Sequence, residues 1–179
     1  MKKRYWLAVL LLIIFTAGCS LGNSPTSKVE ELLKRYNSNA DVVKTELGDY
    51  LSSLNLDEAN QSGYEDVYLR QYSDLTYVIK DEQIDGDEAV VSVQVKVYDY
   101  YKAEQDINDY VSSHQNQFYG DDDVYSSEKA LKYRIDELKK VSDKVEYNLD
   151  FTLTKVNNVW TVDTLTNEQL EKIHGTYAY

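Results

Sequence analysis

Two stretches of the chain alternate strictly between apolar and polar residues, and this pattern limits the possible folds more than any other feature. A period of two is typical of a strand with one face on a core and the other in water. The pattern therefore predicts long antiparallel strands, each half-buried. The apolar positions are Val91, Val93, Val95 and Val97 in the first stretch, and Val145, Tyr147, Leu149, Phe151 and Leu153 in the second.

The first stretch is preceded by a turn signal, Asp85-Gly86, and by a shorter apolar alternation that includes Tyr77 and Ile79. A two-residue turn at Asp85-Gly86 would set Ile79 opposite Ser92, and a slip of one residue puts core side chains into water. We therefore expect a three-residue loop, residues 84–86, with Gly86 left-handed in a bulge. This loop would pair Ile79 with Val91 and Tyr77 with Val93.

The second stretch is followed by Asn157-Asn158, which is typical of a type I′ hairpin turn. A two-residue turn here places Trp160 opposite Lys155 and Val162 opposite Leu153. Strand parity and turn chemistry agree without adjustment, so a second hairpin is expected.

The other segments have the 3.6-residue apolar period of helices. Ser24-Pro25 is typical of an N-cap and a first helical residue, and Ser27 with Glu30 offers a capping box one turn later. Apolar residues then recur to Leu54, with a break expected near Asn39. Further helices are predicted over residues 64–72, 102–113 and 127–141, and a last short helix between a Thr166/Gln169 capping box and Gly175.

The order of elements indicates an α+β fold, in which N-terminal helices pack on a curved antiparallel four-stranded sheet. A helical insertion separates the two hairpins. Over residues 26–175 the hydrophobic pattern, the "NNVWTVDTL" strand and the closing "EKIHGTY" resemble the nuclear-transport-factor-two-like, or cystatin-like, cone fold. The resemblance implies a small lipoprotein of the kind found in Gram-positive bacteria, in a family of unknown function. It also implies a cone-shaped cavity, whose mouth the inserted helices could cap.

The N-terminus has the features of a secretory signal peptide. Lys2, Lys3 and Arg4 precede an apolar stretch that spans 13 residues from Trp6 to Gly18, whereas a membrane-spanning helix needs about 20. Cys19 is the single cysteine and follows Ala17-Gly18. Ala17-Gly18-Cys19 resembles the lipobox of bacterial lipoproteins, although Thr16 stands where that family usually has Leu.

The lipobox resemblance implies a diacylglycerol thioether on Cys19, and two acyl chains anchor a protein stably. We therefore expect a signal peptide over residues 1–18, a lipidated cysteine with a polar tether over 19–25, and one extracytoplasmic domain over 26–179. Cleavage after Gly18 removes three positive charges and moves the net charge from −12 to −15. Such a charge disfavours nucleic acid and repels anionic lipid head groups. The expected partner of Cys19 is thus the membrane, with the domain standing off its surface.

The chain offers little catalytic chemistry. Its histidines are His114 and His174, and it has no nucleophile elbow, phosphate loop or zinc motif. His174 is expected as a cation in the last turn of a helix, and His114 as a solvated side chain. The run Asp121-Asp122-Asp123 lacks the spacing of a calcium loop. No cofactor, metal site or catalytic residue is assigned.

The candidate ligand-binding residues lie on the expected strands. Asp99 follows the inward valines with the same parity, and a buried carboxyl beside phenols can serve as a base. The alternative for Asp99 is a helix cap. Likewise the many tyrosines around Asp99 form either a recognition surface or half-buried core. The candidates are Tyr77, Tyr98, Asp99, Tyr147 and Trp160.

Three functions are compatible with these observations. The first is a non-catalytic, membrane-tethered extracytoplasmic module that binds a small apolar ligand or an envelope protein. The second is a cone-fold lyase, isomerase or hydrolase that uses Asp99 and Tyr147, which the fold resemblance implies. The third is an accessory subunit of an envelope complex without a ligand pocket.

Overall fold

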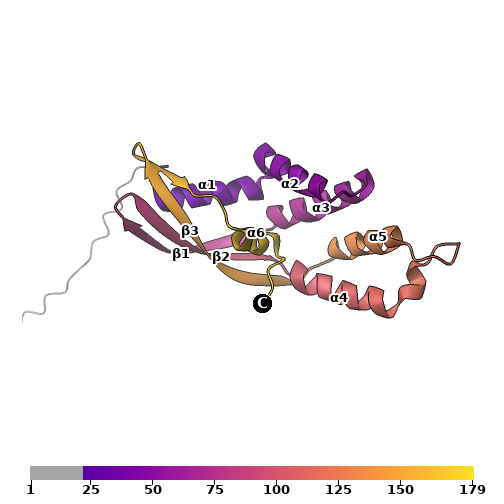
Figure 1. Cartoon of the computed structure of the whole chain (residues 1–179). Coiled ribbons are helices and arrows are strands. Elements are labelled where there is room, and N and C mark those ends of the chain that lie inside the picture. Colours follow the sequence, from indigo (N-terminus) through magenta and orange to yellow (C-terminus); the bar gives the residue numbers. More distant parts are fainter. Residues whose placement is uncertain (1–21) are drawn as a thin grey trace, which may run out of the picture.

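A computed structural model describes residues 22–179, so the predicted signal peptide and Cys19 lie outside the described residues. It has an antiparallel sheet with the strand order β1-β2-β3-β4 (Figure 1). Along the chain, helices precede the first hairpin, separate the two hairpins and follow the second. The fold is therefore α+β, as the sequence predicts. The strands are β1 (Thr76–Asp85), β2 (Glu88–Tyr98), β3 (Lys144–Val156) and β4 (Val159–Val162). The helices are α1 (Pro25–Asn37), α2 (Asp41–Ser53), α3 (Glu58–Ser73), α4 (Tyr100–Ser113), α5 (Ser127–Leu138) and α6 (Asn167–His174), with a 3₁₀ turn, η1 (Gln115–Phe118).

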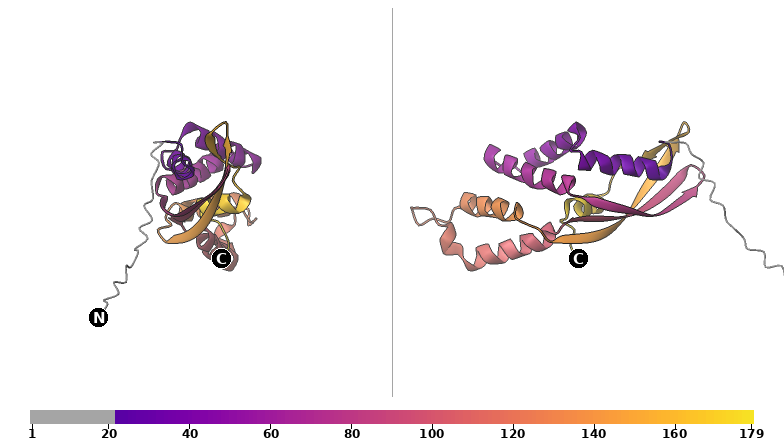
Figure 2. Two further views of the ribbon diagram at one scale, coloured as in Figure 1. Left: turned by 90° about the vertical axis from the view of Figure 1, so that its left-hand side faces the viewer. Right: turned by 180° about the vertical axis from the view of Figure 1, so that it is seen from behind.

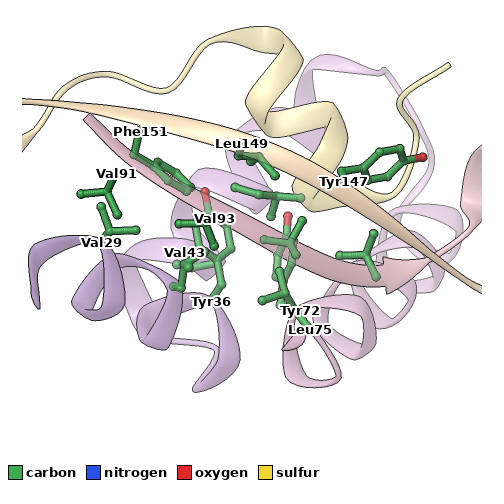
Figure 3. Packing of buried hydrophobic residues seen from close by; sticks show 14 of the residues in the cluster. Val29, Tyr36, Val43, Tyr72, Leu75, Val91, Val93, Tyr147, Leu149 and Phe151 are labelled. Atoms are coloured by element: carbon green, nitrogen blue, oxygen red, sulfur yellow. The ribbon is translucent and has the colours of Figure 1, made fainter. Parts of the chain in front are cut away.

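The central strands β2 and β3 carry the main core on one face. Val91 pairs with Phe151 and Val95 with Tyr147. The alternate valines of β2 are at most 1% exposed, namely Val91, Val93, Val95 and Val97. Helix α1 packs on this face through Val29 (Figure 3), and Ile173 of α6 belongs to the same buried cluster. The strict alternation in the sequence thus reports burial on one side of the sheet.

The β1–β2 hairpin differs from the prediction in its turn and its register. Asp85 pairs with Glu88 across a two-residue turn, and Ile79 lies opposite Val93 instead of Val91. Parity is restored by a bulge at Lys80 within β1, rather than by a three-residue loop. Gly86 has a φ of +62°, so its left-handed conformation is confirmed.

The β3–β4 hairpin forms as predicted. Lys155 pairs with Trp160 and Leu153 with Val162, and both turn asparagines, Asn157 and Asn158, have positive φ. Two successive left-handed residues are what a type I′ turn requires.

The predicted helix signals are largely confirmed. Ser24 caps α1 with Pro25 as its first residue, although the capping-box partner is Ser27 instead of Glu30. The break near Asn39 separates α1 from α2, and Asn39 is left-handed. Helix α3 begins earlier than predicted, because Asp57 caps it at the amide of Asn60. The Thr166/Gln169 box and the left-handed Gly175 bound α6.

The molecule is elongated. The α4–α5 hairpin projects from one end of the sheet, and the strand turns with the start of α1 lie at the other (Figure 2). Arg70 of α3 holds the base of the projection, because its guanidinium donates to the carbonyls of Lys139 and Val141 at 3.0 and 2.8 Å. A second, smaller core lies there around Val67 and Ile107.

Candidate functional site

A pocket of about 590 Å³ opens between α2, α3 and α6 and lies within the size range of small-molecule sites. Its wall is largely aromatic. Tyr68 and Tyr72 are four residues apart on α3 and so share one helix face. The lining residues are Tyr36, Val43, Glu46, Leu47, Tyr50, Tyr68, Tyr72, Asn167, Leu170, Glu171, His174 and Thr176.

The rings that line this pocket, hereafter the aromatic pocket, form one continuous cluster. His174 lies at its centre, with its ring centroid 5.1 Å from that of Tyr68 and 5.8 Å from that of Tyr72. Tyr50 stands 6.4 Å from His174, and Tyr36 meets Tyr72 edge to face at 5.1 Å. Four helices, α1, α2, α3 and α6, therefore supply a single aromatic surface.

Two tyrosines of this surface have buried side chains whose hydroxyls have no hydrogen-bond partner among residues 22–179. Tyr36 is 5% exposed and Tyr72 is 2% exposed, yet within residues 22–179 neither hydroxyl has a hydrogen-bond partner. Neither oxygen is fully enclosed, so each keeps some accessible surface, and both residues line the aromatic pocket. The two rings stand among the core side chains with their hydroxyls directed alike (Figure 3).

The other buried tyrosines of the described chain satisfy their hydroxyls within the protein. Tyr98 donates to Asp74 Oδ2 at 2.5 Å, Tyr100 to the carbonyl of Val67 at 3.1 Å, and Tyr147 to that of Tyr177 at 3.0 Å. The hydroxyls of Tyr36 and Tyr72 have no partner among residues 22–179 and are not fully enclosed, so water or a ligand can bond to them. The two hydroxyls of the aromatic pocket therefore call for a partner from outside the chain.

Burial keeps the titratable rings of the aromatic pocket neutral. It raises the pKa of Tyr36 to about 12, with a smaller contribution from the nearby Glu46 carboxylate, and it raises the pKa of Tyr68 and Tyr72 as well. Burial also lowers the pKa of His174 to about 4. The sequence correctly places His174 in the last turn of a helix, but the expected cation there is wrong, because the half-buried ring is neutral at pH 7.

The charged groups of the aromatic pocket are both acidic. Glu46 on α2 and Glu171 on α6 are exposed members of the lining, and neither has an ion-pair partner within 4.0 Å among residues 22–179. The lining contains no lysine or arginine. The pocket thus combines a neutral aromatic floor with a negative rim.

Asp99 takes the position of a helix cap. Its Oδ1 accepts from the amide of Lys102 at 3.0 Å, and its Oδ2 accepts from the Tyr179 hydroxyl at 2.6 Å. It also borders a smaller cavity of about 270 Å³ beside α4. The helix-cap alternative is therefore what the structure shows, with both carboxylate oxygens engaged.

The other candidates from the sequence lie apart from the aromatic pocket. Tyr147 is close to Asp99 through Tyr179, whose ring centroid is 6.4 Å from its own. Tyr77 is half-buried against the main core, and Trp160 is 6% exposed in that core with Lys155 Nζ 5.3 Å from its ring centroid. The structure does not gather the five candidates in one cavity, and their role in ligand binding stays a prediction.

Sequence reasoning placed the tyrosines of the aromatic pocket on apolar helix faces but missed the pocket. Tyr36, Tyr50, Tyr68 and Tyr72 have helical spacing, which predicts burial. The feature of the sequence that could have indicated a polar pocket is the use of Tyr at positions where Phe would pack equally well.

The described part of the chain offers no other obvious chemistry. Asp121, Asp122 and Asp123 form an exposed turn, and residues 22–179 contain no group of three or more His, Cys, Asp or Glu placed to hold a metal ion. His114 is half-buried and stacks on Tyr110 at 4.2 Å. Over the same residues, no helix is long and apolar enough to cross a membrane.

Comparisons with known proteins add little to this geometry. No protein-family model matches the sequence, and no curated protein matches it. A solved structure that resembles the chain is the proposed lipoprotein ycdA of Bacillus subtilis, at 20% identity and a TM-score of 0.45. The match covers 82% of this chain and 46% of that one, so the chain spans about half the length of ycdA. A likeness this distant assigns no function.

Proposed function

We propose that the chain is a lipid-anchored protein on the outer face of a bacterial cell membrane, and that its domain binds a small ligand in the aromatic pocket without transforming it. The observation that carries the binding role is the pair of accessible hydroxyls without a partner among residues 22–179, on the otherwise buried side chains of Tyr36 and Tyr72. A ligand in the pocket would supply the partners that the protein does not. A volume of about 590 Å³ favours a small molecule over a segment of an envelope protein.

The anchor is supported by the lipobox-like Ala17-Gly18-Cys19 at the end of a signal peptide. The path from the anchor to the domain is short. Asn23 Nδ2 donates to the carbonyl of Asn158 at 2.8 Å, and its Oδ1 accepts from the amide of Trp160 at 3.1 Å. Four residue steps from Cys19 to Asn23 span at most about 14 Å. A lipid on Cys19 would therefore hold the β3–β4 turn close to the bilayer.

A non-catalytic role fits the state of the titratable groups. In the aromatic pocket, burial places the pKa of Tyr36 at about 12 and that of His174 at about 4, so the first is a weak acid and the second a weak base at pH 7, and carboxylates lie only at the rim. A general base would have to sit within hydrogen-bond reach of a substrate proton. Outside the pocket, Asp99 accepts two hydrogen bonds and Tyr147 donates one, so no observation favours the lyase, isomerase or hydrolase.

Thermal unfolding in the presence of a panel of small fragments tests the binding role. Leu170 is half-buried in the pocket wall, and Leu170→Trp should fill the pocket. The matched control is Val124→Trp, at a position that is 60% exposed and outside the lining. We expect fragments that raise the melting temperature of the wild type and of V124W but not of L170W, because a ligand stabilises the folded state to which it binds. Equal responses in all three proteins, or none in any, would refute the binding role.

The anchor is tested separately by Cys19→Ala. We expect the variant to leave the membrane fraction, and mass spectrometry of the native protein to show a diacylglycerol thioether on Cys19. Retention of the variant, or a free thiol in the native protein, would refute the anchor and leave the binding role unaffected.

A further inference from the structure

We propose that the aromatic pocket selects a small organic ammonium ion with an apolar body. This inference rests on the proposed function, because it names the class of ligand for the same site. Three features of the pocket carry it: the exposed ring faces, the negative rim and the unpartnered phenol oxygens.

The ring faces provide an attractive surface for a cation. The face of an aromatic ring is the negative part of its quadrupole, and a cation within about 6 Å of the centroid is attracted to it. Tyr50 is 45% exposed and meets Tyr68 edge to face at 6.4 Å, next to the His174 ring. An ammonium ion that lies on this surface also buries its alkyl groups against the rings.

The rim adds charge complementarity. Glu46 and Glu171 come from different helices and have no ion-pair partner among residues 22–179, so their carboxylates are available to a bound cation. No basic side chain of the lining competes with the ligand or repels it, since His174 is neutral at pH 7. The same arrangement disfavours an anion, because nothing in the lining would compensate its charge.

The unpartnered hydroxyls are the third feature that favours an ammonium ion. An ammonium N–H is a donor only, and a phenol oxygen can accept from it. The oxygens of Tyr36 and Tyr72 both keep some accessible surface and lack donors among residues 22–179. The pocket thus provides an ammonium ion with acceptor oxygens and with negatively charged carboxylates. The domain's overall negative charge also raises the local concentration of cations.

Three probes of nearly equal shape test the inference: benzylammonium, benzyl alcohol and benzoate. Their affinities are measured by isothermal titration calorimetry on the wild type and on the double variant Glu46→Gln with Glu171→Gln. The control is Glu30→Gln with Glu88→Gln, which removes two exposed carboxylates outside the pocket lining. Both double variants have the same net charge, so a difference between them reports the local effect of the rim.

We expect benzylammonium to bind about tenfold more tightly than benzyl alcohol, and benzoate to bind most weakly. The rim variant should lose about tenfold in affinity for benzylammonium and little for benzyl alcohol, while the control keeps the affinity of the wild type within about threefold. L170W should bind none of the probes.

Two results would overturn the inference. One is equal or tighter binding of benzyl alcohol or benzoate, which would leave a pocket for neutral or anionic ligands and keep the proposed function. The other is no binding of benzylammonium. In that case a fragment that stabilises the wild type but not L170W would still uphold the proposed function, and the failure of both experiments would refute the binding role itself.

Discussion

Tyr72→Phe removes one oxygen atom from the middle of the molecule and should cost almost nothing in stability. The Tyr72 side chain is 2% exposed, and its hydroxyl has no hydrogen-bond partner within residues 22–179. Tyr100 provides a matched control, because it is also 2% exposed but donates to the carbonyl of Val67 at 3.1 Å. Both substitutions keep the ring and its packing, so the difference between them isolates the hydrogen bond.

The expected magnitudes follow from the two environments. Loss of a buried hydrogen bond costs about 1 kcal/mol, and more where the acceptor is left unsatisfied. We therefore expect Tyr100→Phe to lower the free energy of unfolding by about 1 to 2 kcal/mol. Tyr72→Phe should change it by less than about 0.5 kcal/mol, since it leaves no orphaned group. For a domain of this size, 1 kcal/mol corresponds to about 2 to 4 °C in melting temperature.

Urea unfolding, followed by circular dichroism, measures both variants against the wild type. Benzylammonium adds a second measurement, because Tyr72→Phe should reduce its affinity while the ligand-free protein stays stable. If Tyr72→Phe destabilised the free protein as much as Tyr100→Phe, the Tyr72 hydroxyl would have a structural partner. Tyr72 would then offer no unpartnered hydroxyl to a ligand.

Three further predictions concern other parts of the molecule. Burial lowers the pKa of His174 to about 4, while an unfolded histidine titrates near 6.5. Between these two pH values only the unfolded state takes up the proton, so the free energy of unfolding decreases as the pH is lowered from 7 to 4. Replacing His174 with Phe should remove up to about 3 kcal/mol of this loss between pH 7 and 4, measured by urea unfolding, and the same change at the other histidine should not. Gly175→Ala should cost at least about 2 kcal/mol in the same assay, because φ is +76° and a Cβ would lie 2.0 Å from the Tyr98 carbonyl oxygen; wild-type stability would contradict this packing. In the anchored protein, a fluorophore at Val159→Cys should be quenched by head-group quenchers and one at Asp121→Cys should not, because Asn23 binds at the β3–β4 turn, whereas equal quenching would refute the short tether.

In the sheet, the sequence predicts the register of the second hairpin but not the position of the bulge in the first. Alternation and turn chemistry together determine the β3–β4 register, because Asn157-Asn158 leaves a single solution that buries Leu153. In the first hairpin the same parity rule demands one extra residue but does not say where it goes. A three-residue loop and a bulge at Lys80 both satisfy the rule, and residues 80–85 are polar or exposed, so no burial pattern distinguishes them.

The aromatic pocket lies beyond what periodicity can predict. Helical spacing correctly marks Tyr36 and Tyr72 as core positions, because the pattern reports where the ring packs. Whether a hydroxyl finds a partner depends on which helices meet at its end, and here α2, α3 and α6 converge from distant parts of the chain. The neutral state of His174 has the same origin. Its place at a helix terminus is local information, whereas its burial comes from Tyr50, Tyr68 and Tyr72 on other helices.

The choice of ligand and the proposed anchor are physically consistent. Contact between Asn23 and the β3–β4 turn places the proposed anchor at the strand turns. Helices α2, α3 and α6, whose residues line the aromatic pocket, lie away from these turns (Figure 1). A ligand therefore enters from the water and not from the bilayer. A hydrocarbon would partition into the membrane, but a small ammonium ion stays in solution. Its binding requires that the free-energy cost of its desolvation is offset in the pocket. Carboxylates at the rim and acceptor oxygens at the floor offset that cost, which a purely apolar pocket could not do.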